Sequence, residues 1–243
     1  MAGYIGSKAV LLSTTAATVT GDMTVDTSTL KVDSSNNRVG IGTASPTSAL
    51  HVSGGAGTNI AIQSSAGTHW RIGDGVGSTN GNLVIYDYSD SRKVFEIDTL
   101  GHVTMPSQPA FSVTKSGHQS NLSSGLTTIT FDTERFDQNG DFASNTFTAP
   151  VTGRYQLSFN LYLDGITQAS NYYQANLATS NRKYYFVFDP DFGQNNVFWN
   201  LNGSLLVEMD AGDTATIEMD LGNDVDGTND INAVSSFHGF LAC

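Results

Sequence analysis

The clearest pattern in the chain is a strict alternation of apolar and polar positions in its second half. Apolar side chains occupy every other position of Tyr155–Leu163. A period of two places one row of side chains on a single face of a β-strand. The same alternation returns at Leu205–Met209 and Ala215–Leu221. We therefore predict long strands in this half, each with one buried face.

Turn signals separate these strands, at Ala211-Gly212-Asp213, Gly222-Asn223-Asp224 and Asp226-Gly227. Glycine, asparagine and aspartate favour turns because they tolerate left-handed backbone or accept hydrogen bonds from nearby amides. About eight to ten short strands within one domain are typical of a jelly roll. We predict an all-β sandwich over residues 108–243.

The first half carries shorter apolar runs. Leu30–Asp33 precedes Asn37–Ile41, and Phe95–Asp98 precedes Gly101–Met105, so each pair predicts a strand, a turn led by aspartate, and a second strand. Further short strands are expected at Ala49–Val52, Ile60–Gln63 and Leu83–Tyr86. Such strands expose edges and bury little within one chain. We therefore expect an intertwined shaft in which several chains close these edges against one another.

Texture and charge both change near Met105–Pro109, where two prolines would interrupt a strand ladder. We predict three regions: an N-terminal arm (1–28) without an apolar face, a β-rich shaft (29–107), and a head (108–243). Residues 1–108 hold 8 acidic and 6 basic residues, whereas residues 109–243 hold 15 and 5. The head is therefore strongly acidic.

The net charge of −12 argues against nucleic acid as a partner, because tracking phosphates needs a basic face. No apolar run is long enough to insert through a membrane. The single cysteine, Cys243, excludes an intrachain disulfide and a cysteine-based zinc site.

The shaft region resembles a segment found in the shafts of bacteriophage tail fibres and related trimeric adhesins. The matching residues are Leu30–Asp33, Asn37–Thr43, Pro46 and Leu50–Val52. The opening Met1–Gly6 also resembles the start of some phage fibre proteins. The resemblance implies a virion protein whose N-terminus attaches to a tail or baseplate protein.

The head resembles a C1q-type domain of the C1q/TNF superfamily over nearly its whole length. The matching segments are Pro109–Val113, Asn139–Phe142, Phe147–Phe159, Gly203–Asp213 and Ser235–Leu241. Two departures stand out: the interval from Phe142 to Phe147 is slightly shorter than usual, and Leu157 stands where an aromatic residue is common. Leucine fits a core-facing strand position, so neither departure threatens the fold. The resemblance implies a homotrimeric jelly roll used for binding.

No catalytic constellation is visible, and we predict that the protein is not an enzyme. Gly73–Gly77 matches a phosphate loop only in its glycine content, so we interpret it as a tight turn. No two histidines have metal-ligand spacing, and we interpret all five as surface or packing residues: His51, His69, His102, His118 and His238.

Calcium is the one cofactor that the head suggests, because Ca²⁺ takes several oxygen ligands and two loops are acidic. Some C1q-like trimers bind calcium near their apex through two aspartates. The first of these positions falls on Asp191, but the second falls near Trp199. The loop Asn223–Asp230 offers Asp224, Asp226 and Asp230 without an EF-hand ligand pattern. Ordinary solvated acidic loops are the alternative.

Three segments of the head break the alternation and concentrate aromatic and acidic residues: Asp164–Tyr173, Asp189–Trp199 and Gly222–Asp230. Loops on a rigid scaffold vary without loss of core stability, so they often bind. We predict that these loops contact a host receptor, either a cell-surface glycan or a protein. The residues proposed for this contact are Tyr172, Tyr173, Phe192, Trp199, Asp224 and Asp226. At a trimer interface the same aromatic residues would instead be core.

The combined prediction is a homotrimeric phage tail fibre located on the virion, with an N-terminal anchor and a host-binding head. A capsid-surface head fibre or decoration protein is the alternative. A bacterial surface adhesin and a depolymerase of host glycan are further alternatives.

Overall fold

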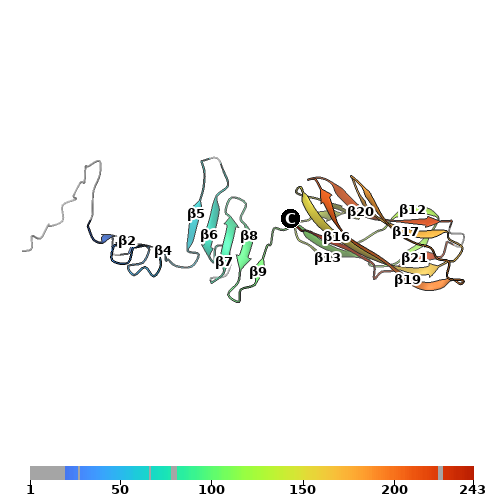
Figure 1. Ribbon diagram of the computed structural model, residues 1–243, viewed down its shortest axis with the longest axis horizontal. Helices are drawn as coiled ribbons and strands as arrows, with labels where there is room; N and C mark the ends of the chain where they lie inside the picture. The colour runs from blue at the N-terminus through green and yellow to red at the C-terminus, as the bar shows by residue number, and fades with distance from the viewer. Residues whose placement is uncertain (1–19, 27, 66, 78–80, 224–226) are drawn as a thin grey trace, which may run out of the picture. The chain divides into compact units, whose positions relative to one another are not determined.

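The computed structural model describes residues 20–26, 28–65, 67–77, 81–223 and 227–243. Every regular element in these residues is a β-strand (Figure 1), which confirms the predicted all-β class. No helix in this part of the chain is long and apolar enough to span a membrane. The chain divides between Thr104 and Met105 into two compact units, here called the N-terminal unit and the C-terminal unit.

The N-terminal unit begins with a small sheet whose strands follow the chain order β1-β2-β3-β4. Its β3–β4 pair is parallel and the others are antiparallel. The strands are β1 (Met23–Val25), β2 (Leu30–Asp33), β3 (Arg38–Ile41) and β4 (Leu50–Val52). We expected the arm to extend to residue 28, but β1 lies within it, because Met23 pairs with Val32 and Val25 with Leu30.

A second sheet in this unit is an antiparallel meander in chain order. Its strands are β5 (Asn59–Ile62), β6 (Trp70–Asp74), β7 (Leu83–Asp87), β8 (Arg92–Ile97) and β9 (Val103–Thr104). Strand β6 was not predicted from the sequence, because it holds only two apolar residues, Trp70 and Ile72, and its end overlaps the turn predicted over Gly73–Gly77. The turn predicted over Gly73–Gly77 is confirmed only for its second part, where Gly75 and Gly77 adopt positive φ.

Both turns led by aspartate are confirmed. The Asp33 carboxylate accepts a backbone amide hydrogen bond at 3.1 Å, and Asn37 adopts a φ of 54°. The Asp98 carboxylate accepts backbone amides at 2.8 and 2.9 Å, and Gly101 adopts a φ of 87°. The pKa of both aspartates is lowered, because hydrogen bonds stabilise the ionised carboxylate. The largest cause is a side-chain hydrogen bond, from Asn36 to Asp33 and from His102 to Asp98, and the backbone amides add to it.

The C-terminal unit consists of two sheets that enclose one core (Figure 1). The first sheet has the order β11-β21-β16-β22-β10-β13, with β19 paired to β16. Its strands are β10 (Ala110–Thr114), β11 (Gln119–Leu122), β13 (Thr133–Asp137), β16 (Gly153–Ile166), β19 (Asn196–Met209), β21 (Asn229–Ile231) and β22 (Ser236–Leu241). We call the side of this sheet that faces away from the core its outer face.

The second sheet has the order β14-β15-β20-β17-β18, with β12 paired to β20. Its strands are β12 (Gly125–Thr128), β14 (Phe142–Ala143), β15 (Thr146–Thr148), β17 (Tyr172–Thr179), β18 (Lys183–Phe188) and β20 (Thr214–Gly222). Consecutive strands therefore alternate between the sheets in several places, as expected for a sandwich with long connections.

The predicted alternation governs the packing of this unit. On β16 the five side chains of the apolar row are at most 2% exposed, and on β20 the corresponding row is equally buried. The two rows face each other across the core. Aromatic rings fill one end, where Phe111 stacks on Phe147 at 4.7 Å and meets the edge of Phe237 at 5.0 Å.

Gly203 on β19 lies where two aromatic rings meet. Phe159 and Phe186 contact edge to face with centroids 5.0 Å apart. A Cβ at residue 203 would lie about 2.5 Å from Phe186 and 2.6 Å from Phe159. Only glycine leaves room for this ring pair.

Candidate functional site

An aromatic stack lies at one end of the C-terminal unit, where β18 ends and β19 begins. It consists of Tyr173, Phe188, Phe192 and Trp199. The ring centroid of Phe188 lies 4.9 Å from that of Trp199 and 5.1 Å from that of Tyr173. The ring centroids of Phe192 and Trp199 are 5.0 Å apart. Phe192 is 40% and Trp199 36% exposed. Two predicted binding residues are therefore brought together on the surface, supported from below by two rings that the fold fixes.

The predicted loops are shorter than the sequence suggested. Trp199 belongs to β19 and pairs with Leu163, and Tyr173 belongs to β17 and pairs with Phe188 and Leu221. Residues 167–171 and 189–195 form two of the connections, and residues 224–226 of the third segment lie outside the described residues. Cross-strand pairing thus absorbs the ends of all three predicted loops into the sheets.

The two predicted tyrosines differ in their surroundings. Tyr173 is fully buried; its hydroxyl accepts a hydrogen bond from the Thr167 amide at 2.9 Å and donates one to the Asn229 side chain. Tyr173 therefore positions the loop between β16 and β17 and presents no surface. The Tyr172 hydroxyl lies 3.4 Å from a carboxylate oxygen of Asp220, whose charge raises the pKa of Tyr172.

Of the four predicted calcium ligands, the structure describes Asp191 and Asp230. Asp224 and Asp226 lie outside the described residues. Asp191 is exposed and donates its amide to Asp189 at 3.0 Å. Asp230 accepts hydrogen bonds from the Asn121 amide at 2.8 Å and the Ser120 hydroxyl at 3.1 Å. In the part of the chain that the structure describes, no group of three His, Cys, Asp or Glu side chains has the arrangement to hold a metal ion.

Asp230 instead forms an acidic pair. It is the direct cross-strand partner of Asp164, and His118 Nδ1 lies 3.6 Å from Asp164 and 3.9 Å from Asp230. Like charges on directly opposed residues are destabilising in a sheet. The Asn232 amide group, which donates to Asp164 at 2.9 Å, offsets part of this repulsion.

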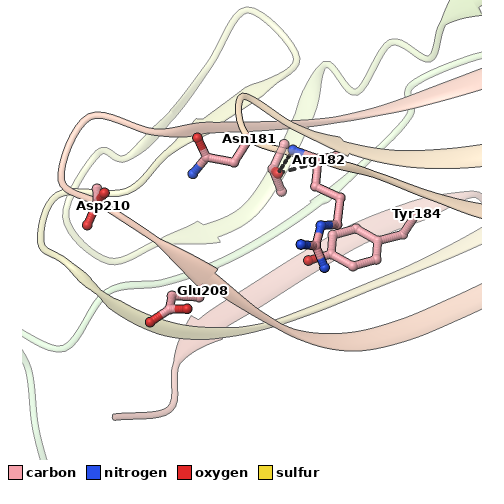
Figure 2. Close-up of a pocket in the computed structure, with 6 residues that line it drawn as sticks. Asn181, Arg182, Tyr184, Glu208 and Asp210 are labelled. Carbon is pink, nitrogen blue, oxygen red and sulfur yellow. Dashed lines mark hydrogen bonds between the residues drawn. The ribbon is translucent and has the colours of Figure 1, made fainter.

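A polar pocket lies at the β17–β18 turn and the end of β19 (Figure 2). Its volume is about 340 Å³, and its lining is Thr179, Asn181, Arg182, Tyr184, Glu208 and Asp210. Figure 2 shows Arg182 lying beside the Tyr184 ring, with Glu208 and Asp210 on the other side of the hollow. The arginine carbon Cζ is 6.0 Å from the ring centroid. Such a pocket offers both signs of charge to a polar molecule.

Hydrogen bonds hold the wall of this pocket rigid. Thr179 accepts the Arg182 amide at 3.0 Å and donates its hydroxyl to the Arg182 carbonyl at 2.9 Å. Asp213 accepts the Ser180 hydroxyl at 2.7 Å and the Asn181 amide group at 2.5 Å. These bonds, led by the one from Ser180, lower the pKa of Asp213. The pocket could not be predicted from the sequence, because its lining comes from two separate segments, Thr179–Tyr184 and Glu208–Asp210.

Exposed apolar side chains also mark the outer face of the first sheet. Leu206 and Phe240 flank Gln156 from the two neighbouring strands and are 55% and 51% exposed. Phe198 is 57% exposed and lies 5.5 Å from the Tyr162 ring. We call Leu206 and Phe240 the outer patch; Phe198 lies toward the other end of β19. Apolar side chains exposed together on one face are typical of protein–protein contact.

Two antiparallel sheets packed around one core define the C-terminal unit as a β-sandwich. The family model described as "C1q domain" matches residues 110–242, which is more than half of the chain. The chain therefore belongs to the C1q domain family, as the motifs of the head predict. None of the curated proteins matches the chain.

Among solved structures, similar chains include the globular domain of zebrafish complement 1qA protein. That protein is 22% identical, covers 56% of this chain and 98% of its own, and has a TM-score of 0.42. Murine APRIL at pH 8.0 is 9% identical, covers 55% of this chain and 98% of its own, and also has a TM-score of 0.42. Murine APRIL at pH 5.0 is 8% identical with the same coverages and a TM-score of 0.38.

Proposed function

We propose that this protein is a homotrimeric receptor-binding fibre of a bacteriophage, attached to the virion by its N-terminus and contacting the host through its C1q head. The observation that carries the proposal is the joining of a C1q domain to a separate β unit with a phage-fibre-like sequence. C1q domains are binding modules that typically form trimers. A trimer also places three copies of each weak contact at one tip, which raises avidity when receptors are dense.

The outer patch supports the trimer. Leu206 and Phe240 lie on either side of Gln156 on the outer face of the first sheet. Apolar side chains in such a position are stabilised when a second sheet or subunit covers them. Between the patch residues the outer face is polar; Ser158 and Ser204, for example, are hydrogen bonded at 2.7 Å. Hydrogen-bonded polar groups among apolar contacts fit an interface in which register matters.

The aromatic stack supports the host contact. Trp and aromatic side chains bury large areas with few torsions to freeze, which suits them to be anchors at binding sites. Phe192 and Trp199 are partly exposed, and Trp199 stacks on the partly buried ring of Phe188, so they are held in place before a partner arrives. The acidic head disfavours strongly anionic receptors unless a cation bridges them.

The proposal is tested with the full-length chain. Light scattering should give a mass near 77 kDa, about three times the 25.8 kDa of one chain. The labelled protein should bind intact bacterial cells and compete with phage for adsorption. Binding that disappears with EDTA would favour a calcium-dependent contact at the acidic loops. A monomer at micromolar concentration would contradict the fibre.

Placement on the particle is tested separately. Antibodies against the chain should label tail fibres on particles; labelling of the capsid would favour a head fibre or decoration protein instead. Release of shortened polysaccharide from host envelopes after incubation would favour a depolymerase.

A further inference from the structure

One face of the β5–β9 sheet is built almost entirely from apolar side chains. The strand register places Ile60 opposite Ile72, Ile72 opposite Ile85, and Ile85 opposite Phe95. Side chains on directly paired residues point to the same side of a sheet. We call this side the isoleucine face; its apolar members are Ile60, Ile62, Trp70, Ile72, Leu83, Ile85, Phe95, Ile97 and Val103, and the charged residues Asp74, Asp87 and Arg92 lie at its ends.

The isoleucine face is open. Ile60, Ile62, Leu83 and Val103 are 48–55% exposed, and Ile72 is 37% exposed. A hollow of about 270 Å³ runs over it, with Ile60, Ile72 and Leu83 in its lining. Monomeric soluble proteins rarely leave contiguous apolar patches larger than a few hundred Å² uncovered. This face is therefore a surface that another layer must cover.

The opposite face of the same sheet is buried at its middle strands, whereas Ala61 on β5 and Thr104 on β9 are exposed there. Val84 and its cross-strand partner Glu96 are 0% and 8% exposed, and Val76 in the adjoining loop is 5% exposed. The Glu96 carboxylate accepts hydrogen bonds from Lys93 and from the Asn82 side chain, both at 2.6 Å. The sheet thus has one finished side and one unfinished side, whereas a stable β domain needs two packed layers.

We propose that the isoleucine face of each chain packs against the isoleucine faces of further copies of the same chain. The inference rests on the proposed trimer, which holds identical faces at the same distance from their heads and so at high effective concentration. It differs from the expectation drawn from the sequence, in which strand edges close against each other. Here the copies meet through side chains, and no strand needs to be added to a neighbouring sheet.

The chemistry of the sheet favours a second copy over a charged partner. Its rim charges are already satisfied internally, by the ion pairs Arg92–Asp87 at 3.2 Å and Lys93–Glu96 at 2.6 Å. The one basic side chain that the register places at an end of the isoleucine face is Arg92, and it is ion-paired with Asp87 and Asp90. An identical apolar face is complementary to it without leaving any buried charge unpaired, which would be costly.

Cross-linking tests the contact directly. In full-length protein with Cys243→Ser, Ile60→Cys, Ile62→Cys and Ile72→Cys are each treated with a short bis-maleimide. We expect most of the chain to shift to a covalent dimer for at least one of them. The matched control is Ala61→Cys, because Ala61 is exposed on the same strand but points to the opposite face. Equal cross-linking of Ala61→Cys, or none at the isoleucine positions, would overturn the proposal.

A second pair of variants separates this contact from the trimer itself. Ile60→Asn should increase amide hydrogen exchange across β5–β9 about tenfold or more. The substitution weakens the core shared between the copies, so local opening of this sheet costs less free energy. Ala61→Asn should change it little. If light scattering shows a trimer but Ile60→Asn and Ala61→Asn exchange alike, the face-to-face shaft is wrong and the fibre stands. If the parent chain is a monomer, the proposed trimer is wrong, and the inference falls with it.

Discussion

The two units of this protein solve the same problem of covering an apolar sheet in opposite ways. In the C-terminal unit, the rows on β16 and β20 face each other and are at most 2% exposed. In the N-terminal unit, the isoleucine face of the β5–β9 sheet leaves Ile60, Ile62 and Leu83 48–55% exposed. The C-terminal unit contains its own core, whereas the β5–β9 sheet of the N-terminal unit leaves much of one apolar face exposed.

The difference follows from strand length. Strands of 14 residues, such as β16 and β19, support a continuous row of core side chains and pair along nearly their whole length. Strands of two to six residues, as in β5–β9, carry one or two such side chains each. Short strands therefore favour a design in which burial is shared between chains, whereas long strands complete a domain alone.

The largest expected effect is on the self-contained core. Phe159→Asp places a carboxylate in the middle of the β16 row, where the side chain is 2% exposed. An unpaired buried charge costs several kcal/mol, which is comparable with the stability of a whole domain. We expect the C-terminal unit to lose its cooperative thermal transition. Ser158→Asp, one residue away on the outer face, should still unfold cooperatively; similar melting of the two variants would contradict the assignment of faces.

The sequence predicted this core because alternation is a local signal. From Tyr155 to Leu163, apolar and polar residues alternate, and this alternation predicts which side chains face the core. The C1q motifs add the order of the strands. The aromatic stack was predicted only in part. Phe192 and Trp199 were chosen for their chemistry, but the burial of Tyr173 depends on pairing with Phe188 and Leu221. Such contacts across long sequence separations leave no local pattern.

The isoleucine face shows the same limit. Its residues belong to five short strands, and β6 was not predicted. Without β6 the register that aligns Ile60, Ile72 and Ile85 cannot be drawn. The short runs correctly indicated strands that bury little within one chain, but only the register distinguishes association through faces from association through edges.

The next largest effect concerns association of the heads. Leu206→Ser removes an apolar side chain from the outer patch, and we expect it to raise the dissociation constant of the trimer about tenfold or more. Its effect on the unfolding of one chain should be small, because the side chain is 55% exposed. Sedimentation at several concentrations measures the shift. Leu126→Ser is the control, because Leu126 is 53% exposed but lies on the other sheet; equal dissociation in both variants would exclude the outer patch as the contact.

A smaller effect is expected at the aromatic stack. Trp199→Ala should reduce binding of the full-length protein to host cells several-fold, because the anchor over Phe188 is lost, while the melting temperature changes little. Phe136→Ala provides the comparison, since Phe136 is 53% exposed on β13, outside the stack. If cell binding is unchanged by Trp199→Ala, or falls only in proportion to lost stability, the stack is not the host contact.

The smallest expected effect is a dependence of the head on pH. His238 lies on the outer face between two serines, Ser112 and Ser158, with no carboxylate directly opposite it. The His238 side chain keeps solvent exposure, but partial desolvation by the surrounding sheet lowers its pKa below the ordinary value of 6.5. The unfolded chain then binds more protons than the folded one as the pH falls below 6.5. The stability from neutral His238 is therefore fully present above that pH and is lost as the pH falls through the folded pKa.

Calorimetry between pH 7 and pH 5 measures this loss, which we expect to lower the melting temperature by about 1–3 °C. The pKa values of Asp132 and Asp213 are lowered from 3.8, so their contribution is lost only at more acidic pH, whereas burial raises the pKa of Asp141. Comparison with a His238 variant therefore assigns the effect. His238→Gln should flatten the profile. If other copies cover the outer face, burial of His238 is deeper in the trimer, and the pH effect should grow with protein concentration; a profile that His238→Gln leaves unchanged would show that His238 is not its source.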